Sequence, residues 1–217
     1  MTAEGIAVDV LGVPITPWTW PELRDRICHW ASGPTERRET ILYANVHVLN
    51  SAVRDPNLTR ILRGASTVYC DGSGVRLGAW LLGSSIPTRI TGADFIDDLC
   101  RALASRGLSL FLLGGSPGVA DQARRTLAGR HPDLRFAGTH HGYFTAEDSM
   151  RVVEAVNSSR PDVILVGMGT PRQEAWIDAN RQHLRVRVVW AVGALLDFVS
   201  EKEQRAPNWM TKWHLEW

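Results

Sequence analysis

The stretch "LSLFLLGGSPGVADQARRTLAGRHP" (Leu108–Pro132) joins an apolar run, a pair of glycines and a polar segment with helical spacing. The run at 108–115 is apolar on both faces and stops at glycine, which predicts a buried strand. The segment 117–130 predicts a helix, with Ser116 as its N-cap and Pro117 in its first position. The stretch therefore predicts one strand–helix unit of an α/β fold.

The same alternation of short apolar runs and helical patterns continues through most of the chain. The runs that predict strands lie at 40–44, 66–70, 108–115, 133–138, 162–169 and 186–193. The segments with helical spacing lie at 46–64, 73–83, 92–106, 117–130, 146–158 and 171–183. Strands that are apolar on both faces and joined by helices predict a mostly parallel sheet with helices on both faces.

The two ends of the chain differ from this pattern. The segment "IAVDVLGVPIT" predicts a small extra strand or hairpin ahead of the sheet. Residues 201–217 are first polar and then aromatic, which predicts the start of a C-terminal appendage. No internal repeat or linker interrupts the rest, so residues 1–200 are expected to form a single α/β domain.

Composition excludes several classes of protein. The 217 residues carry 24 basic and 23 acidic side chains, a balance that argues against nucleic acid as a partner. Cys28, Cys70 and Cys100 show no C-x-x-C spacing, so reduced thiols in a cytoplasmic protein are expected. The first 16 residues lack a basic region followed by an apolar run, and no window is apolar over 18 residues, so neither a signal peptide nor a bilayer-spanning segment is expected. Nine tryptophans are compatible with core packing or with a membrane-facing surface.

Small and polar residues follow several of the expected strands. In open parallel sheets, ligands bind beyond the carboxyl ends of the strands. Glycines allow a ligand to approach the backbone, and the helix N-termini that follow favour anions. Neither glycine loop fits a Walker or G-x-G-x-x-G pattern, and tight turns are an equal explanation for them. The residues concerned are Asn45, Asp71, Gly72, Gly114, Gly115, Gly167, Met168, Gly169, Thr170 and Gly193.

Two acidic residues have structural explanations beside functional ones. Asp71 precedes a glycine and an expected helix, so its local sequence is that of a turn or an N-cap. Asp197 lies in an apolar stretch, where a buried carboxylate is costly and is expected to have a specific partner. The local pattern alone leaves these alternatives open.

Other polar residues are equally ambiguous from spacing alone. Arg89 can bind an anion or remain a surface cation, and Tyr143 can stack on a base or fill the core. Gln173 and Glu174 open a helix after a glycine-rich strand end, where they can reach a ligand; Thr170 and Gln173 also fit a capping box.

A metal site has little support in the sequence. The adjacent His140 and His141 have no acidic partner at ligand spacing. No metal site and no cofactor are therefore expected.

The full set of motifs resembles the WecG/TagA/CpsF glycosyltransferases. The resemblance runs from about Ile6 to the last residue, and the ordered set is specific although each piece alone is weak. The motifs that carry it are "YANVHVLN", "DGSGVRL", "PTRITGADF", "LFLLGGSPGVA", "GTHHGYF", "ILVGMGTPRQEAWI", "AVGALLDF" and "RAPNWMTKWHLEW".

This resemblance implies a Rossmann-like α/β fold of the GT-E type and a bacterial enzyme without a divalent metal. It implies inverting transfer from a UDP-sugar to a polyprenyl-diphosphate-linked saccharide. The product would feed teichoic acid, common antigen, capsule or exopolysaccharide. The enzyme would be peripheral at the inner face of the cytoplasmic membrane. The resemblance also suggests that copies of the chain associate as a homo-oligomer.

The resemblance also assigns roles to individual residues. Asp71 matches the proposed catalytic base, which would take the proton of the acceptor hydroxyl. Arg89 and Gln173 match polar residues that contact the sugar or the diphosphate. Tyr143 and Asp197 match positions associated with uridine.

Residues around the expected sugar site complete this comparison. Asn45 matches an asparagine near the sugar, and the glycine loops would meet the charge of the leaving UDP. Many relatives have threonine where this chain has Tyr43, which would reshape the pocket for sugar or acceptor. Gly193-Ala194 stands where relatives often have two glycines.

Relatives usually continue past "LEW" with a basic, apolar segment that is thought to bind the membrane and cover the active site. The resemblance therefore implies that the appendage is truncated, and that this form binds UDP but turns over poorly. Two alternatives remain open at this point. One is an oxidoreductase with a nucleotide cofactor, and the other is a non-catalytic protein that binds a sugar nucleotide.

Overall fold

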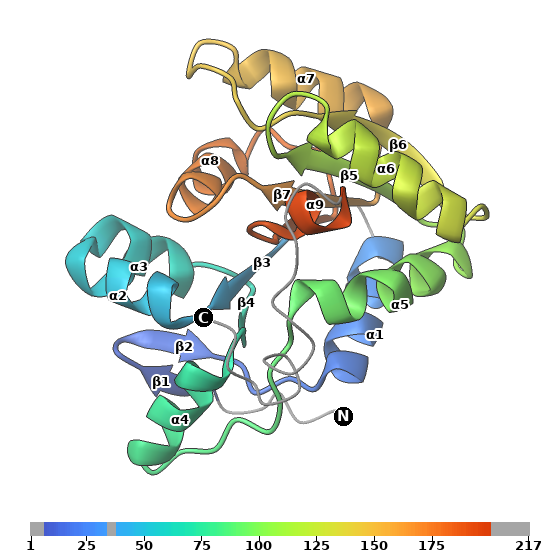
Figure 1. The fold of residues 1–217 in the computed structure, drawn as a ribbon. Coiled ribbons are helices and arrows are strands. Elements are labelled where there is room, and N and C mark those ends of the chain that lie inside the picture. Colours follow the sequence, from blue (N-terminus) through green and yellow to red (C-terminus); the bar gives the residue numbers. More distant parts are fainter. Residues whose placement is uncertain (1–6, 34–37, 201–217) are drawn as a thin grey trace.

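A six-stranded sheet forms the centre of the computed structural model, which describes residues 7–33 and 38–200 (Figure 1). Its strand order is β4-β3-β8-β7-β5-β6, and every neighbouring pair is parallel. The strands are β3 (Glu39–Ala44), β4 (Thr67–Cys70), β5 (Ser109–Gly114), β6 (Arg135–His140), β7 (Val163–Gly167) and β8 (Val188–Ala191). All six expected strands are confirmed.

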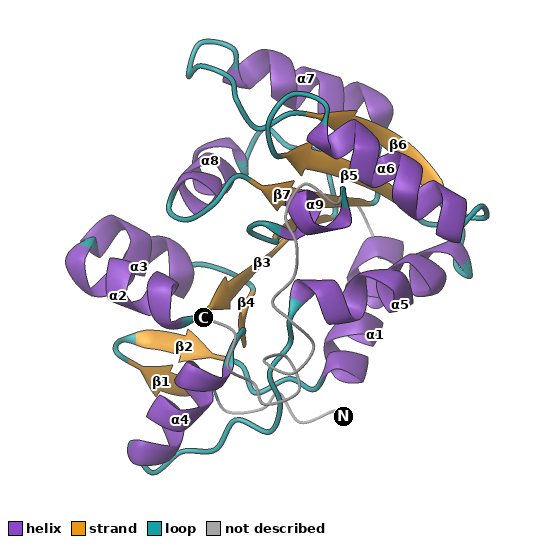
Figure 2. Ribbon diagram, in the orientation of Figure 1, coloured by secondary structure: helices purple, strands orange, loops and turns teal. Residues whose placement is uncertain are grey.

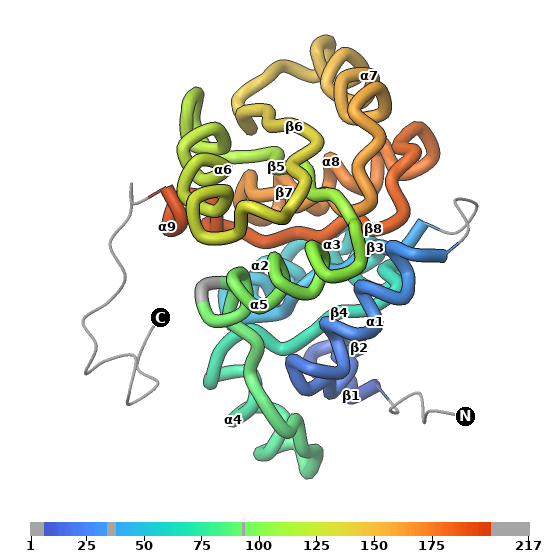
Figure 3. The backbone as a smooth tube through the Cα atoms, turned by 90° about the vertical axis from the view of Figure 1, so that its right-hand side faces the viewer, coloured from blue at the N-terminus to red at the C-terminus, as the bar shows by residue number. Residues whose placement is uncertain are grey.

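Helices cover both faces of the sheet, as Figure 2 shows. One group of contacting helices contains α1, α5, α6 and α9, and another contains α2, α3 and α8 (Figure 3). The helices are α1 (Trp20–Ser32), α2 (Val46–Arg54), α3 (Pro56–Arg63), α4 (Ser73–Leu81), α5 (Gly92–Ala104), α6 (Val119–Arg130), α7 (Ser149–Ser159), α8 (Arg172–Asn180) and α9 (Leu195–Val199). The α/β class with a parallel sheet between two helical layers is confirmed.

The helix pattern differs from the expectation in four places. The segment expected as one helix at 46–64 is divided into α2 and α3, because Pro56 begins α3 and the Asp55 side chain accepts a hydrogen bond from Asn57 N. Helices α1 and α9 were not expected. Helix α6 begins at Val119 rather than Pro117, because Gly118 adopts a left-handed conformation (φ 91°) and takes the N-cap position expected for Ser116.

The expected N-terminal β element is an antiparallel hairpin of β1 (Val8–Val10) and β2 (Val13–Ile15). Its turn, Leu11-Gly12, has positive φ at both residues, the geometry of a tight two-residue hairpin. The hairpin lies beside the edge strand β4, where Thr16 N donates a hydrogen bond to Val68 O (2.8 Å). This contact covers part of an otherwise open sheet edge.

Aromatic rings join the sheet to α1 and α5. The Phe95 ring stacks on Trp190 of β8 with centroids 4.7 Å apart, and Trp20 stacks on Phe95 at 4.8 Å. Trp190 and Phe95 are fully buried, so these two rings serve core packing. Cys28, Cys70 and Cys100 are all buried and free, as expected for reduced thiols. Residues 201–217, where the appendage was expected, lie outside the described residues.

Candidate active site

The parallel sheet brings the expected site residues to one edge, where the carboxyl ends of its strands meet; we call this the carboxyl edge. Asn45 directly follows β3, and Asp71 directly follows β4. Gly114 and Gly167 end β5 and β7, and Gly193 follows β8. Because β4, β3, β8, β7 and β5 are consecutive neighbours, segments far apart in sequence meet along this edge.

Backbone hydrogen bonds fix the position of Asp71. Its N–H donates to Ala44 O (2.9 Å), which ties it to the end of β3. Ile90 N donates to Cys70 O (2.9 Å), so the chain returns past the end of β4 and brings Arg89 and Thr91 near Asp71. The Asp71 side chain is half-buried. It therefore lies at the edge of the core and not in a free surface turn.

Burial raises the pKa of Asp71 from 3.8 to about 6. The Thr91 and Asn45 side chains and the positive charge of Arg89 act in the opposite direction, and the Asp94 charge adds to the increase. A carboxylate with this pKa is ionised at neutral pH and is more basic than an ordinary aspartate. Both properties suit a general base.

The capping explanation for Asp71 is wrong. Helix α4 has Gly72 in its N-cap position, with φ at 107° and no side-chain cap. Asn45 is the residue that caps a helix here, since its Oδ1 accepts a hydrogen bond from Val48 N (2.9 Å) at the start of α2. The Asp71 carboxylate is thus not used to begin the helix that follows it.

The glycines of the carboxyl edge allow neighbouring strand ends to pack backbone against backbone. A Cβ on Gly114 would lie 2.1 Å from Gly167 O, and a Cβ on Gly167 would lie 2.7 Å from Gly193 O. Gly115 N donates to Gly167 O (2.9 Å), so that amide is already used within the protein. Gly169 differs, because it has positive φ and open space around its Cβ position. Close packing explains Gly114 and Gly167, while Gly169 leaves room beside the loop.

Gln173 is fully buried and links the loops after β7 and β8 to the end of strand β3. Its Oε1 accepts hydrogen bonds from Gly193 N (3.1 Å) and Met168 N (3.4 Å). Its Nε2 donates to Tyr43 OH (3.2 Å) and to Glu174 Oε1 (2.8 Å). Every polar atom of this side chain therefore has a protein partner, which gives Gln173 a positioning role in this structure.

The expected capping box of Thr170 and Gln173 does not form. Pro171 occupies the N-cap position of α8, and the Thr170 hydroxyl donates instead to Glu174 Oε1 (2.9 Å). Glu174 is fully buried, and its Oε2 has no hydrogen-bond partner among the described residues. Burial raises the pKa of Glu174, while hydrogen bonds from Gln173 and Thr170 oppose the increase.

Two further expected site residues lie on exposed or half-exposed elements. Tyr143 is 65% exposed, and the Arg172 guanidinium lies 5.5 Å from the centre of its ring. The expectation that it fills the core is wrong, and its ring is open to stacking. Asp197 is half-buried in the first turn of α9, next to a helix N-terminus, which was one of the two kinds of partner expected for it.

Thr91 is a neighbour of Asp71 that the sequence motifs did not indicate. The available signal was its place two residues after Arg89, in the segment that returns to the end of β4. His140 and His141 do not belong to a metal cluster. In the described ranges, no group of three or more His, Cys, Asp or Glu residues can hold a metal ion.

Comparison with known proteins identifies the family. The sequence profile described as "Glycosyl transferase WecG/TagA/CpsF family" matches residues 8–217. This chain belongs to that family. The glycosyltransferase is 30% identical over 210 residues to two proteins named N-acetylglucosaminyldiphosphoundecaprenol N-acetyl-beta-D-mannosaminyltransferase, from Staphylococcus aureus strains MRSA252 and NCTC 8325 / PS 47. The match covers 97% of this chain and 82% of each relative.

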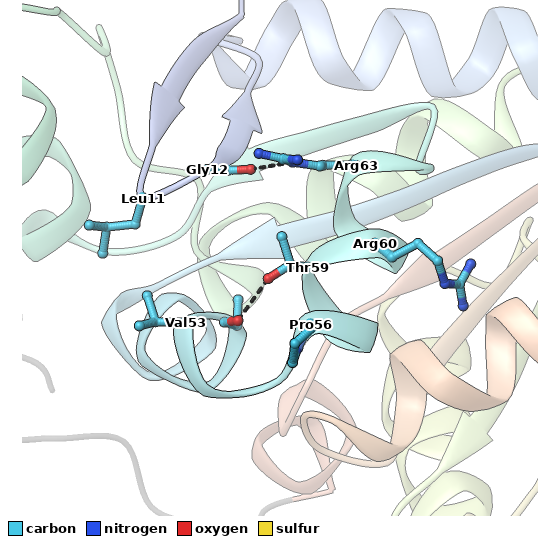
Figure 4. A pocket seen from close by; sticks show the side chains of 8 residues that line it. Leu11, Gly12, Val53, Pro56, Thr59, Arg60 and Arg63 are labelled. Atoms are coloured by element: carbon cyan, nitrogen blue, oxygen red, sulfur yellow. Dashed lines mark hydrogen bonds between the residues drawn. The ribbon is translucent and has the colours of Figure 1, made fainter.

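A groove of about 620 Å³ lies elsewhere on the glycosyltransferase, between the β1–β2 turn and helices α2 and α3 (Figure 4). Arg63 Nε donates to Gly12 O (2.6 Å) across one side of it. None of the expected site residues lines this groove. The titratable and glycine-rich groups meet at the carboxyl edge, and we therefore place the candidate active site there.

No helix in the described part of the glycosyltransferase is long and apolar enough to cross a membrane.

Proposed function

We propose that this glycosyltransferase moves an N-acetylhexosamine from a UDP-sugar to a hydroxyl of a polyprenyl-diphosphate-linked saccharide, with inversion at the anomeric carbon. The observation that carries the proposal is the half-buried Asp71, whose pKa is raised to about 6, at the carboxyl edge beside Arg89. The relatives are named for transfer of an N-acetyl-beta-D-mannosaminyl group to N-acetylglucosaminyldiphosphoundecaprenol. These names supply the class of donor sugar and acceptor.

In the proposed reaction, the acceptor oxygen attacks the anomeric carbon of the donor. The new bond joins that oxygen to the carbon, and the bond from the carbon to the β-phosphate oxygen of UDP breaks. Asp71 takes the acceptor proton as the carbon–oxygen bond forms. UDP leaves with the bonding electron pair, and the Arg89 charge favours the negative charge that develops there.

The remaining residues are proposed to bind and position the substrates. The exposed Tyr143 ring would stack on uracil, and the half-buried Asp197 would accept a hydrogen bond from the nucleoside. Gln173 would hold the loops after β7 and β8 in place rather than touch the donor, because its polar atoms are already paired. Asn45 would orient Asp71.

The proposed reaction requires no divalent metal and no cofactor. Arg89 and the helix N-termini at the carboxyl edge would meet the charge of the leaving diphosphate. We further propose that the protein acts peripherally at the inner face of the cytoplasmic membrane, where a lipid-linked acceptor is held. Membership in a glycosyltransferase family argues against the oxidoreductase alternative. A non-catalytic sugar-nucleotide binder is the alternative that the experiment must exclude.

The test is a screen of UDP-sugars with a GlcNAc-diphosphate-lipid acceptor, with and without a metal chelator. We expect transfer from UDP-N-acetylhexosamines, an inverted anomeric configuration in the product, and no effect of the chelator. Loss of transfer with the chelator would overturn the metal-independent mechanism. UDP binding in a thermal-shift assay without transfer from any donor would favour the non-catalytic binder. Stabilisation by NADH and not by UDP would contradict both.

A further inference from the structure

Helix α4 begins two residues after Asp71 and presents large apolar side chains to solvent. Leu77, Trp80 and Leu81 are 58%, 68% and 71% exposed, and the following Leu82 is 61% exposed. Residues 77, 80 and 81 have i, i+3, i+4 spacing and therefore share one face of the helix. Val75 and Ala79 are buried on the other side. A helix that is apolar on its inner and outer faces is unusual at a surface in contact with water.

Other exposed apolar residues lie on the elements around α4. Val46 of α2 lies against the first turn of α4, where a Cβ on Gly74 would lie 2.6 Å from Val46 Cγ2. Strand β1 contacts α4, and its turn carries the exposed Leu11. Seven of the ten large apolar side chains that are exposed in the described residues lie on α4 and Leu82, α2 and the β1–β2 turn. The exposed apolar surface is thus concentrated near one end of the molecule.

The charges on this part of the chain are compatible with an anionic surface. Residues 72–93 contain two arginines, Arg76 and Arg89, and no Asp or Glu. Arg76 Nε donates to Ile86 O (3.1 Å), which ties α4 to the segment that leads back to Arg89. The adjacent hairpin contributes one acid, Asp9, whose Oδ1 accepts a hydrogen bond from Gly12 N (2.9 Å). The segment between Asp71 and Asp94 thus adds no acidic side chain that anionic lipids would repel.

The position of α4 relative to Asp71 indicates what covers the apolar face. In the proposed function, Asp71 must reach a hydroxyl of a saccharide whose diphosphate is attached to a lipid in the bilayer. The bilayer surface must therefore lie no further from Asp71 than one saccharide and a diphosphate extend. Helix α4 begins two residues after Asp71 and its nine residues give it a length of about 13 Å, so its exposed face stays near Asp71. Figures 1 and 3 show α4 protruding at the end of the molecule opposite α7.

We infer that the face formed by Leu77, Trp80, Leu81 and Leu82 docks on the lipid bilayer and presents Asp71 to the head of the lipid-linked acceptor. Tryptophan and leucine side chains on a helix of this kind enter the boundary between headgroups and acyl chains. The inference rests on the proposed function for its partner. It assigns the membrane contact to α4, independently of residues 201–217.

The test compares the chain with a variant that combines Leu77→Ser, Trp80→Ser and Leu81→Ser. The probe is co-sedimentation with vesicles of phosphatidylglycerol and phosphatidylcholine in equal parts. We expect vesicle partitioning to fall at least ~10-fold, because three large apolar side chains no longer enter the bilayer. Met150→Ser is the matched control, since Met150 is an exposed apolar residue of α7 at the opposite end (45% exposed). It is expected to leave partitioning unchanged.

A second readout separates this inference from the proposed function. The triple variant should lose transfer to a polyprenyl acceptor in vesicles and keep transfer to a water-soluble acceptor with a short alkyl chain. If the unsubstituted chain transfers to neither acceptor, the proposed function fails, while the vesicle assay still decides the role of α4.

Two results would overturn the inference. One is unchanged vesicle partitioning of a folded triple variant, as judged by its circular dichroism. The other is a dimer in analytical ultracentrifugation that the triple variant abolishes, which would make the α4 face an interface between two copies.

Discussion

Asp71 and Glu174 are carboxyl groups on opposite sides of β3 and β8 at the same carboxyl edge, and burial raises the pKa of both. Asp71 is half-buried and lies near the positive charge of Arg89. Glu174 is fully buried, and its Oε1 accepts hydrogen bonds from Thr170 and Gln173. We therefore distinguish the two groups by their access to a substrate as well as by the raised pKa that they share.

Neutralising the two carboxyl groups separately is the strongest test of whether Asp71, and not Glu174, is the base. Asp71→Asn removes the proposed base and keeps the size of the side chain, so the transfer rate should fall about 100- to 10,000-fold. Glu174→Gln should retain most of the transfer rate, because the buried side chain does not reach the acceptor. Steady-state kinetics with UDP binding measured in parallel would check both. Equal losses in the two variants would remove the distinction between the groups.

The pH dependence of transfer sharpens the assignment of Asp71. The proposed base must be ionised, so the transfer rate should fall about 10-fold for each unit of pH below the pKa of about 6 and level off above it. A rate profile with saturating substrates measures this directly. A profile without an inflection in the acidic range would contradict the role of Asp71 in the rate-limiting step.

The positioning role of Gln173 predicts a large effect on stability. Gln173→Ala would leave the backbone amides of Gly193 and Met168 without their partner, while the Tyr43 hydroxyl would keep only its contact with Thr170 Oγ1 (3.4 Å). Each unsatisfied buried group costs about 1–3 kcal/mol of unfolding free energy. Thermal and urea unfolding should show this loss. Gln122→Ala on the exposed surface of α6 is the matched control and should change stability little.

Stability as a function of pH tests the raised pKa values. A carboxyl whose folded-state pKa is raised binds its proton more tightly in the folded state, so its stabilising contribution is complete at low pH. For Asp71 it is complete below about 3.8 and is lost as the pH rises through about 6. Asp71→Asn should therefore raise the melting temperature at neutral pH relative to the unsubstituted chain. This advantage should shrink as the medium is acidified below pH 6.

Glu174→Gln should show the same sign of effect, since burial also raises the pKa of Glu174. The melting temperatures of the two variants should be measured over the same series of buffers. A variant that becomes less stable than the unsubstituted chain at neutral pH would show that the ionised carboxylate is favoured in the folded protein.

The smallest effect on stability is expected at Tyr43, which lies near both Asp71 and Glu174. Tyr43→Phe removes the hydroxyl that accepts a hydrogen bond from Gln173 Nε2 at 3.2 Å. The expected loss is about 1 kcal/mol of unfolding free energy. Tyr143→Phe at the exposed ring is the control and should leave stability unchanged. A loss of donor affinity without a loss of stability would instead give the Tyr43 hydroxyl a direct role in binding.

Local sequence predicted the elements of the fold well, because strands that are apolar on both faces have few other ways to bury their side chains. It failed at boundaries that depend on backbone geometry. Because Gly118 adopts a left-handed conformation, α6 begins later than the sequence predicts. The Asp55-Pro56 pair divides the segment predicted as one helix into α2 and α3. Helix α1 was missed, although Thr19 and Glu22 form a capping box there, with Glu22 Oε2 accepting from Thr19 N (2.8 Å).

The amino-acid sequence is sufficient to predict the family, the succession of strands and helices along the chain, and the residue types that follow each strand. How those residues divide their roles depends on the folded chain, because burial and hydrogen-bond partners follow from the order of the strands within the sheet. The order β4-β3-β8-β7 places Asp71 at an accessible end and encloses Gln173 and Glu174 between neighbouring loops. In the sequence, all three are polar residues close after an apolar strand. Their different solvation in the folded chain separates a proposed base from the residues that hold the loops beside it.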